Sequence, residues 1–146
     1  MKFKLLSESA EKMFAVVFDK EDEIVWTFRR FVTEQQLRAS HFTAIGALSN
    51  VVLGFFDPIQ KQYKRIPIHE QVEVLSLIGD VTIEQGTLEV HAHIVVGKQD
   101  GTAHGGHLLE GHVFPTLELI LAESPQYLTR RRDIETGPAL IDLKAA

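Results

Sequence analysis

The chain of 146 residues contains no cysteine. This absence excludes disulfide bonds, thiolate zinc sites and a cysteine nucleophile, and it suits a reducing compartment. No apolar run approaches the roughly 18 residues that a membrane-spanning helix requires, and the apolar stretch at the N-terminus is too short for a secretory signal. We therefore expect a cytoplasmic protein that does not enter a membrane.

Positive charge is also scarce, because 15 lysines and arginines stand against 20 aspartates and glutamates, for a formal net charge of −5. Proteins that bind nucleic acids usually carry a basic stripe, since contacts between cations and phosphates supply most of their non-specific affinity. The densest basic cluster, at residues 130–132, is interpreted as a solvated turn near the C-terminus, with a patch that contacts phosphates as the alternative. Direct DNA binding by this chain is therefore doubtful.

Apolar side chains are plentiful and make up 45% of the chain. Because no internal repeat or linker interrupts them, residues 1–146 are predicted to form a single domain. Thr33 and Gln36 have the spacing of a capping box, which predicts a short second helix that ends near Ser40. A first helix from about Asp22 is predicted by an apolar stripe with spacings of three and four: Ile24, Val25, Phe28, Phe31 and Val32.

The remainder is predicted to consist of strands, because short runs rich in β-branched and aromatic residues alternate with turn-forming residues. The turns are predicted at residues 49–50, 57–58, 84–86 and 99–101. The strands are predicted at residues 13–18, 41–48, 51–56, 63–69, 72–83, 87–97, 106–113 and 116–122. Short turns favour antiparallel pairing. The expected fold is an α+β domain, a mostly antiparallel mixed β-sheet with one or two helices packed on it.

Four of the seven histidines fall within residues 91–107. Side chains alternate between the two faces of a strand, so His91 and His93 share one face of the strand at 87–97, and an apolar set occupies the other. Two imidazoles at positions i and i+2 can converge on one cation, and zinc accepts nitrogen ligands at about 2.0–2.1 Å. This pair forms part of a candidate metal site.

A third ligand depends on the turn at residues 99–101. A three-residue loop there places His93 directly opposite His107, so that three imidazoles meet. A two-residue loop at 100–101 would turn His107 to the wrong face. We prefer the longer loop, in part because it brings all three histidines to one candidate metal site. The alternative interpretation of the three histidines is that they lie on the surface and bind no metal. The predicted zinc ligands are His91, His93 and His107.

His104 and two glutamates are weaker candidates. An unbroken strand turns His104 away from His107, although a bulge at the two intervening glycines would bring it back as a ligand or a supporting group. Glu89 shares the face of the histidines, whereas the face of Glu73 is open; either is a weak candidate for the catalytic acid or base. The non-catalytic interpretation of Glu89 is a solvated carboxylate on a strand. That of Glu73 is a hydrogen bond at the edge of the core or at an interface. The remaining histidines are interpreted as structural: His41, His69 and His112.

Three ordered segments, at residues 72–79, 91–93 and 105–111, resemble the plants-and-prokaryotes-conserved (PPC) domain family, and residues 44–49 match an earlier family segment. The resemblance covers roughly residues 10–125. It implies an α+β fold and a homotrimer. In prokaryotic members it also implies a zinc site, whose ligands map to His91, His93 and His107.

The same resemblance bears on DNA and on catalysis. Prokaryotic members of the PPC family are often described as predicted DNA-binding proteins, and plant members join the domain to AT-hook segments. This chain has no AT-hook core of the Arg-Gly-Arg-Pro type, and a trimer would be strongly negative. The histidine hairpin is also similar to the zinc site of acetolactate decarboxylase, which implies an enzyme.

Three hypotheses for the function follow: a trimeric zinc-binding domain with a binding or regulatory role, a zinc-dependent enzyme acting on a small carbonyl or carboxylate substrate, and a direct DNA-binding protein. Three histidines leave a tetrahedral zinc one position short, which favours a site open to water or a small molecule. A neighbouring subunit could instead supply the fourth ligand and close the site. Three further cations are interpreted as exposed charges, with contact to a substrate carboxylate as the alternative: Arg29, Arg30 and Arg65.

Overall fold

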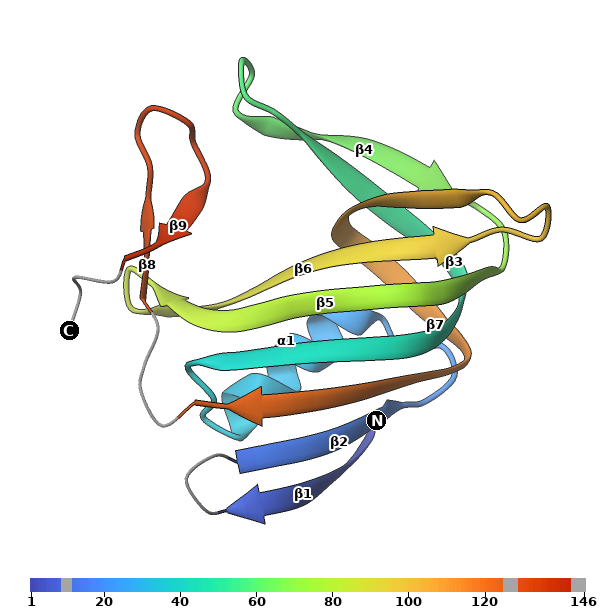
Figure 1. The fold of residues 1–146 in the computed structure, drawn as a ribbon, viewed down its shortest axis with the longest axis horizontal. Helices are drawn as coiled ribbons and strands as arrows, with labels where there is room; N and C mark the ends of the chain where they lie inside the picture. The colour runs from blue at the N-terminus through green and yellow to red at the C-terminus, as the bar shows by residue number, and fades with distance from the viewer. Residues whose placement is uncertain (9–11, 125–128, 143–146) are drawn as a thin grey trace.

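The computed structural model describes residues 1–8, 12–124 and 129–142. The strands are β1 Lys2–Glu8, β2 Lys12–Phe18, β3 Ser40–Asp57, β4 Gln62–Ile68, β5 Val72–Glu84, β6 Thr87–Gly97, β7 Ala103–Glu123, β8 Thr129–Arg132 and β9 Ala139–Ile141, and the helix is α1 Ile24–Glu34. All the strands belong to one sheet, and α1 lies against one of its faces (Figure 1). The predicted α+β class is confirmed, and the parallel pairing of β5 with β8 makes the sheet mixed.

Helix α1 follows from its apolar stripe and its N-cap. The carboxylate of Glu23 accepts the backbone N–H groups of Val25 and Trp26, which have no partner within the helix. The core lies between this helix and the sheet, where the ring of Phe28 meets that of Phe42 with centroids 4.7 Å apart. Four residues of the predicted stripe are buried there: Ile24, Phe28, Phe31 and Val32.

The predicted second helix at residues 33–40 is wrong. The hydroxyl of Thr33 donates to the carbonyl of Arg29 inside the last turn of α1, so it does not cap a new helix. Gln36 then adopts a positive φ of 56°, which takes the chain out of the helical conformation. The capping-box spacing therefore marks the end of one helix, and the chain turns directly into β3.

Two long strands, β3 and β7, continue where breaks were predicted. β3 runs through Ser49 and Asn50, so the turn predicted at 49–50 is wrong, and β7 joins the two strands predicted at 106–113 and 116–122. The register between β3 and β7 shifts on either side of Leu48, as it does at a β-bulge. The turn-forming residues therefore bend a strand instead of ending it.

The bends in β3 and β7 let the strand pairings close into a ring. β3 pairs with β5, β5 with β6, β6 with β7, and β7 again with β3. Gly46 permits the close approach of β3 and β7, because a Cβ there would lie 2.3 Å from the carbonyl oxygen of Thr116. The β3–β4 hairpin and the β8–β9 hairpin both project from this ring (Figure 1).

The C-terminal arginines lie on a strand and not in the predicted turn, although the predicted solvent exposure holds for Arg131 and Arg132. Residues 129–132 form β8, which pairs with β5 through Ile83 and Glu84 and with β9 on its other side. The side chain of Arg130 is only 10% exposed. Within the described ranges, no helix is long and apolar enough to cross a membrane.

Candidate metal centre

The hairpin of β6 and β7 brings three histidines together. Its loop has the predicted three-residue form, closed by the N–H of Lys98, which donates to the carbonyl of Thr102 at 2.9 Å. His93 therefore lies directly opposite His107, as the preferred loop predicted. His91 is two residues away from His93 along β6 and shares its face.

The spacing of the three imidazoles suits a metal ion. One ring nitrogen from each of His91, His93 and His107 lies within 4.8 Å of the others. The Nε2 atoms of His91 and His93 are 3.3 Å apart. Two ligands of a tetrahedral zinc, each about 2.0–2.1 Å from the metal, stand about 3.3–3.4 Å apart. Both the donor set and its spacing therefore fit zinc.

The protonation of the rings also suits a metal. The pKa of His107 is lowered to about 4, mostly by burial and in addition by the charges of His91 and His93. Burial lowers the pKa of His91 as well, and the Arg130 guanidinium adds to that effect. His91 and His107 are therefore neutral at pH 7, which is the form of imidazole that binds a metal.

Tyr63 on β4 packs against the site and was missed by sequence reasoning. Its ring stacks on that of His107 with centroids 4.5 Å apart, and its hydroxyl oxygen lies 3.4 Å from His107 Nδ1. Gly54, the partner of His107 on β3, leaves room for this contact, because a Cβ there would lie 2.9 Å from Tyr63 Cδ1. Burial raises the pKa of Tyr63, so its hydroxyl keeps its proton at neutral pH.

Asp80 and Arg130 flank the opposite side of the site. Asp80 on β5 is the direct strand partner of His91. Its Oδ2 lies 2.7 Å from Arg130 Nη2, and its buried Oδ1 has no hydrogen-bond partner among the described residues. No sequence signal pointed to this pair, because fifty residues separate its members. The ion pair places β8 beside the metal centre.

His104 faces away from the three-histidine group. It pairs with Val96 in a register that runs without a shift from Ala103 to His107. The β6–β7 pairing therefore contains no bulge that would turn the ring of His104 toward His107, and the side chain is exposed. Among the described residues, the set able to hold a metal consists of the three predicted ligands alone.

The two glutamates differ in their distance from the histidines. Glu89 lines the same cleft as His91, but its Oε2 is 2.5 Å from Arg29 Nη2, so the carboxylate already has a cationic partner. Glu73 lies opposite Gly97, at the other end of the β5–β6 pairing, and is exposed. The structure therefore places Glu89 near the candidate site and Glu73 away from it.

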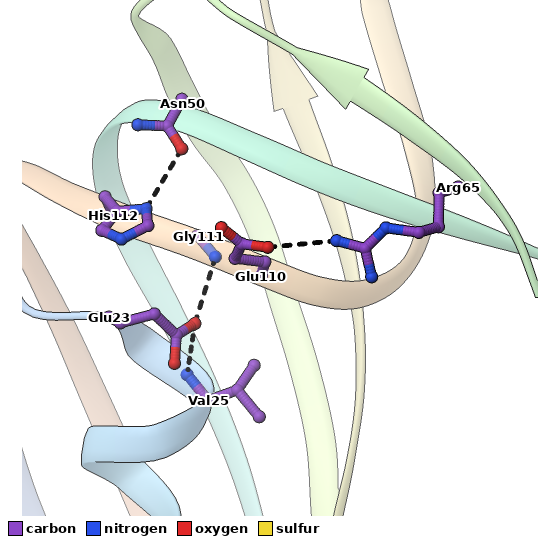
Figure 2. A network of polar contacts seen from close by, with 7 residues as sticks. All are labelled: Glu23, Val25, Asn50, Arg65, Glu110, Gly111 and His112. Carbon is purple, nitrogen blue, oxygen red and sulfur yellow. Dashed lines mark hydrogen bonds and ion pairs between the residues drawn. The ribbon is translucent and has the colours of Figure 1, made fainter.

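A second polar cluster lies farther along β7, where the strand passes the start of α1. Figure 2 shows the Glu23 carboxylate between the helix and this strand: it accepts the N–H of Val25 at 3.1 Å and that of Gly111 at 3.3 Å. A side chain at Gly111 would crowd the helix, since a Cβ would lie 3.0 Å from Ile24 Cδ1. The N-cap of α1 thereby also ties the helix to β7.

The same cluster holds a fourth histidine. A ring nitrogen of His112 lies 3.1 Å from Asn50 Oδ1, and Arg65 Nη2 lies 3.1 Å from Glu110 Oε2 (Figure 2). The structural interpretation of His112 agrees with this contact. His41 and His69 are exposed and lie outside the metal-binding group.

Comparison with known sequences identifies a family. Residues 6–125 match the sequence profile described as the Plants and Prokaryotes Conserved (PCC) domain. Over 111 residues the chain is also 33% identical to the bifunctional protein GlmU of Synechococcus sp. (strain JA-3-3Ab). That match covers 74% of this chain but 17% of the relative, so the chain spans a small part of the curated protein it matches.

Solved structures share the fold over nearly the whole chain. A plant- and prokaryote-conserved (PPC) protein of Pyrococcus horikoshii has a TM-score of 0.83 and 29% identity, and the match covers 98% of this chain and 96% of that one. A metal-containing protein of Archaeoglobus fulgidus has a TM-score of 0.82 and 30% identity, with 97% and 96% covered. A candidate DNA-binding protein of Ralstonia eutropha JMP134 has a TM-score of 0.83 and 25% identity, with 89% and 90% covered.

A solved structure with lower sequence identity also shares the fold. A Staphylococcus aureus protein of unknown function that is similar to α-acetolactate decarboxylase has a TM-score of 0.57 at 13% identity, covering 88% of this chain and 56% of that one. This likeness concerns the fold alone. The profile match, which spans most of the chain, includes all three converging histidines and shows that the chain belongs to the Plants and Prokaryotes Conserved (PCC) domain family, the PPC family that its motifs resemble.

Proposed function

We propose that this PCC domain protein holds a zinc ion with His91, His93 and His107 and uses the remaining coordination position to bind a small molecule, in a binding or regulatory role. The observation that carries the proposal is the convergence of three ring nitrogens within 4.8 Å. The relative from Archaeoglobus fulgidus, which is called metal-containing, supports it. Three protein ligands are typical of open zinc sites, whereas structural sites usually have four.

Neighbouring residues hold the proposed metal ligands in place. The stacked ring of Tyr63 restricts the orientation of His107, and the ion pair of Asp80 with Arg130 lies beside His91. Groups that hold metal ligands in place raise both metal affinity and geometric precision. A bound zinc ion would supply a Lewis acid that polarises a carbonyl or lowers the pKa of water.

The test is the metal content of the purified protein by elemental analysis, with His93→Ala and His104→Ala in parallel. We expect about one zinc per chain in the wild type and in His104→Ala, and none in His93→Ala. His104 is a matched control, because it lies on the same hairpin but faces away from the site. A wild type that stays free of metal after zinc addition and dialysis would contradict the proposal.

A zinc-dependent enzyme acting on a small carbonyl or carboxylate substrate is a second candidate, favoured by the cleft in which His91 and His107 lie. The Tyr63 hydroxyl beside His107 keeps its proton at neutral pH and could donate it. Turnover of a panel of 2-oxo and 2-hydroxy acids by the zinc-loaded protein, lost in His93→Ala and in Tyr63→Phe, would support this function. Absence of turnover across the panel would favour the binding role.

A homotrimer is the proposed assembly. The sheet face opposite α1 exposes several large apolar side chains: Ile45, Leu75, Ile78, Val95 and Ile120. Ile78 is the strand partner of His93, so this face adjoins the candidate metal centre. Light scattering should give the mass of three chains, and Ile78→Asp should lower it. A monomer at micromolar concentration would overturn the proposal.

Direct DNA binding is the least supported of the three functions. The net charge is −5, and arginines that could contact phosphates are engaged by carboxylates: Arg29 by Glu89 and Arg65 by Glu110. A DNA-binding surface would require cations that are free to release counterions from the backbone. Any DNA association would therefore have to arise from a surface that the assembled trimer creates.

A further inference from the structure

The metal centre lies in a cleft between the two projecting hairpins. The cleft has a volume of about 890 Å³, within the range of about 300–1,000 Å³ that is usual for small-molecule sites. Phe56, Lys61 and Tyr63 of the β3–β4 hairpin line one side, and the β8–β9 hairpin lines the other. Lys61 Nζ donates to the carbonyl of Ile134 at 2.7 Å, so the two hairpins touch across the cleft.

Arg130 fixes the second wall. Its three side-chain nitrogens each have a protein partner: Nη2 pairs with Asp80 at 2.7 Å, Nε donates to the hydroxyl of Thr82 at 3.1 Å, and Nη1 donates to the carbonyl of Ala139 at 2.7 Å. These partners lie on β5 and β9, so one side chain holds the β8–β9 hairpin to the sheet. Arg130 therefore acts as an anchor, with each of its three side-chain nitrogens bonded to the protein.

The next two arginines, in contrast, are exposed to solvent and loosely paired. The side chains of Arg131 and Arg132 are 79% and 71% exposed, and both line the cleft. Their nearest carboxylate contacts are longer: 3.4 Å from Arg131 to Asp142 and 4.0 Å from Arg132 to Glu84. A planar guanidinium with loosely held partners can turn to bind a carboxylate through two parallel hydrogen bonds.

We propose that this cleft binds a small organic acid, with one oxygen at the open coordination position of the metal and a carboxylate at Arg131 and Arg132. The apolar residues Phe56 and Ile134 line the cleft between these polar ends and suit a short carbon skeleton. The inference deepens the proposed function and rests on it, because it names the class of molecule that reaches the metal.

The charges of the cleft agree with an anionic ligand. Its lining contains Lys61 and three arginines against Glu84, Glu89 and Asp133. Glu89 is already paired with Arg29, which lies outside the cleft lining, and Asp133 accepts hydrogen bonds from Thr136. With a divalent ion added to these side chains, the cleft carries a net positive charge. An organic acid would neutralise that charge, whereas a neutral ligand would leave it.

The experiment is calorimetric titration of the zinc-loaded full-length protein with succinate, repeated with inorganic phosphate. The variant is Arg131→Ala/Arg132→Ala, and the control is Arg30→Ala, which removes an exposed arginine of α1 whose partners are Glu34 and Trp26, away from the cleft. We expect succinate to bind the wild type and Arg30→Ala equally, and the double variant about tenfold more weakly. Phosphate should bind the wild type more weakly than succinate.

Zinc content, measured on each sample before titration, separates the two proposals. A wild type without zinc would end both. Normal zinc content with equal succinate affinity in the wild type and the double variant would overturn the organic-acid proposal alone. Phosphate binding as tight as succinate binding would also overturn it, because the cleft would then recognise any anion at the metal and make no use of a carbon skeleton.

Discussion

Two of the three histidines on strand β7, His107 and His112, are five residues apart, and their surroundings differ in kind. His107 meets two other imidazoles and a tyrosine ring, whereas His112 meets the amide oxygen of Asn50. The first group brings one ring nitrogen from each of three imidazoles within 4.8 Å of the others. The second pairs ring, amide, carboxylate and backbone N–H in complementary fashion (Figure 2).

This difference separates a polar cluster that stabilises the fold from one that is arranged to bind a ligand. A complementary cluster such as that of Glu23 and Gly111 is complete without any other molecule, so it contributes to folding stability. A convergent cluster of partly buried imidazoles costs desolvation, which a bound cation would offset. Its presence in a folded domain is therefore evidence for a ligand, whereas histidine content alone is not.

The largest expected effect is stabilisation of the convergent cluster by zinc. A ligand that binds only the folded state, at about 100 times its Kd, stabilises that state by about 2.7 kcal/mol. We expect zinc to raise the midpoint of thermal unfolding for the wild type and for His112→Ala, but not for His107→Ala. An equal rise in His107→Ala would show that zinc binds elsewhere, and the contrast between the two clusters would fail.

A change in the complementary cluster should act on folding alone. Glu23→Ala removes the N-cap of α1, which is worth about 1 kcal/mol, and leaves the N–H of Gly111 without its acceptor, at a cost of about 1 kcal/mol. We expect a loss of about 2 kcal/mol in urea unfolding, with zinc content unchanged. Glu34→Ala on the same helix is the control and should lose less than about 0.5 kcal/mol.

The metal-free protein should lose stability in acid because of His107. Its pKa of about 4 in the fold lies below the ordinary value of 6.5, so the unfolded chain binds more protons between these values. Stability is therefore complete above pH 6.5 and falls as the pH approaches 4, by about 1 kcal/mol after allowance for partial solvent exposure. Urea unfolding should be measured at several pH values from 4 to 7. The free energy of unfolding should change less with pH in His107→Asn than in the wild type, and an equal change would contradict the assignment.

The smallest effect is expected from His112→Ala. The substitution removes one hydrogen bond to Asn50, which is worth about 0.5–1 kcal/mol, and leaves the three converging imidazoles untouched. Chemical unfolding should register this loss, and elemental analysis should find the same zinc content as in the wild type. Zinc loss in this variant would mean that the two clusters are coupled along β7.

Some elements of the fold could be predicted from the spacing of apolar residues in the sequence. The stripe of α1 and the alternation in β6 were visible because burial imposes periods of 3.6 and 2 on the sequence. Bulges hid the continuity of β3 and β7, since Ser49 and Asn50 serve a bulge as well as a turn. The helix expected at residues 33–40 was wrong because a hydroxyl can bond backward into its own helix as well as cap the next one.

The sequence by itself determined the β6–β7 hairpin and narrowed its register to two loop lengths, of which the preferred one places His93 opposite His107 as observed, because a hairpin register depends on its local turn. Only the tertiary structure decided the surroundings of these histidines. Tyr63 reaches His107 over the side-chain-free Gly54, and Arg130 reaches Asp80 across fifty residues. Such contacts depend on how bent strands close on one another, and no period in the sequence records that closure.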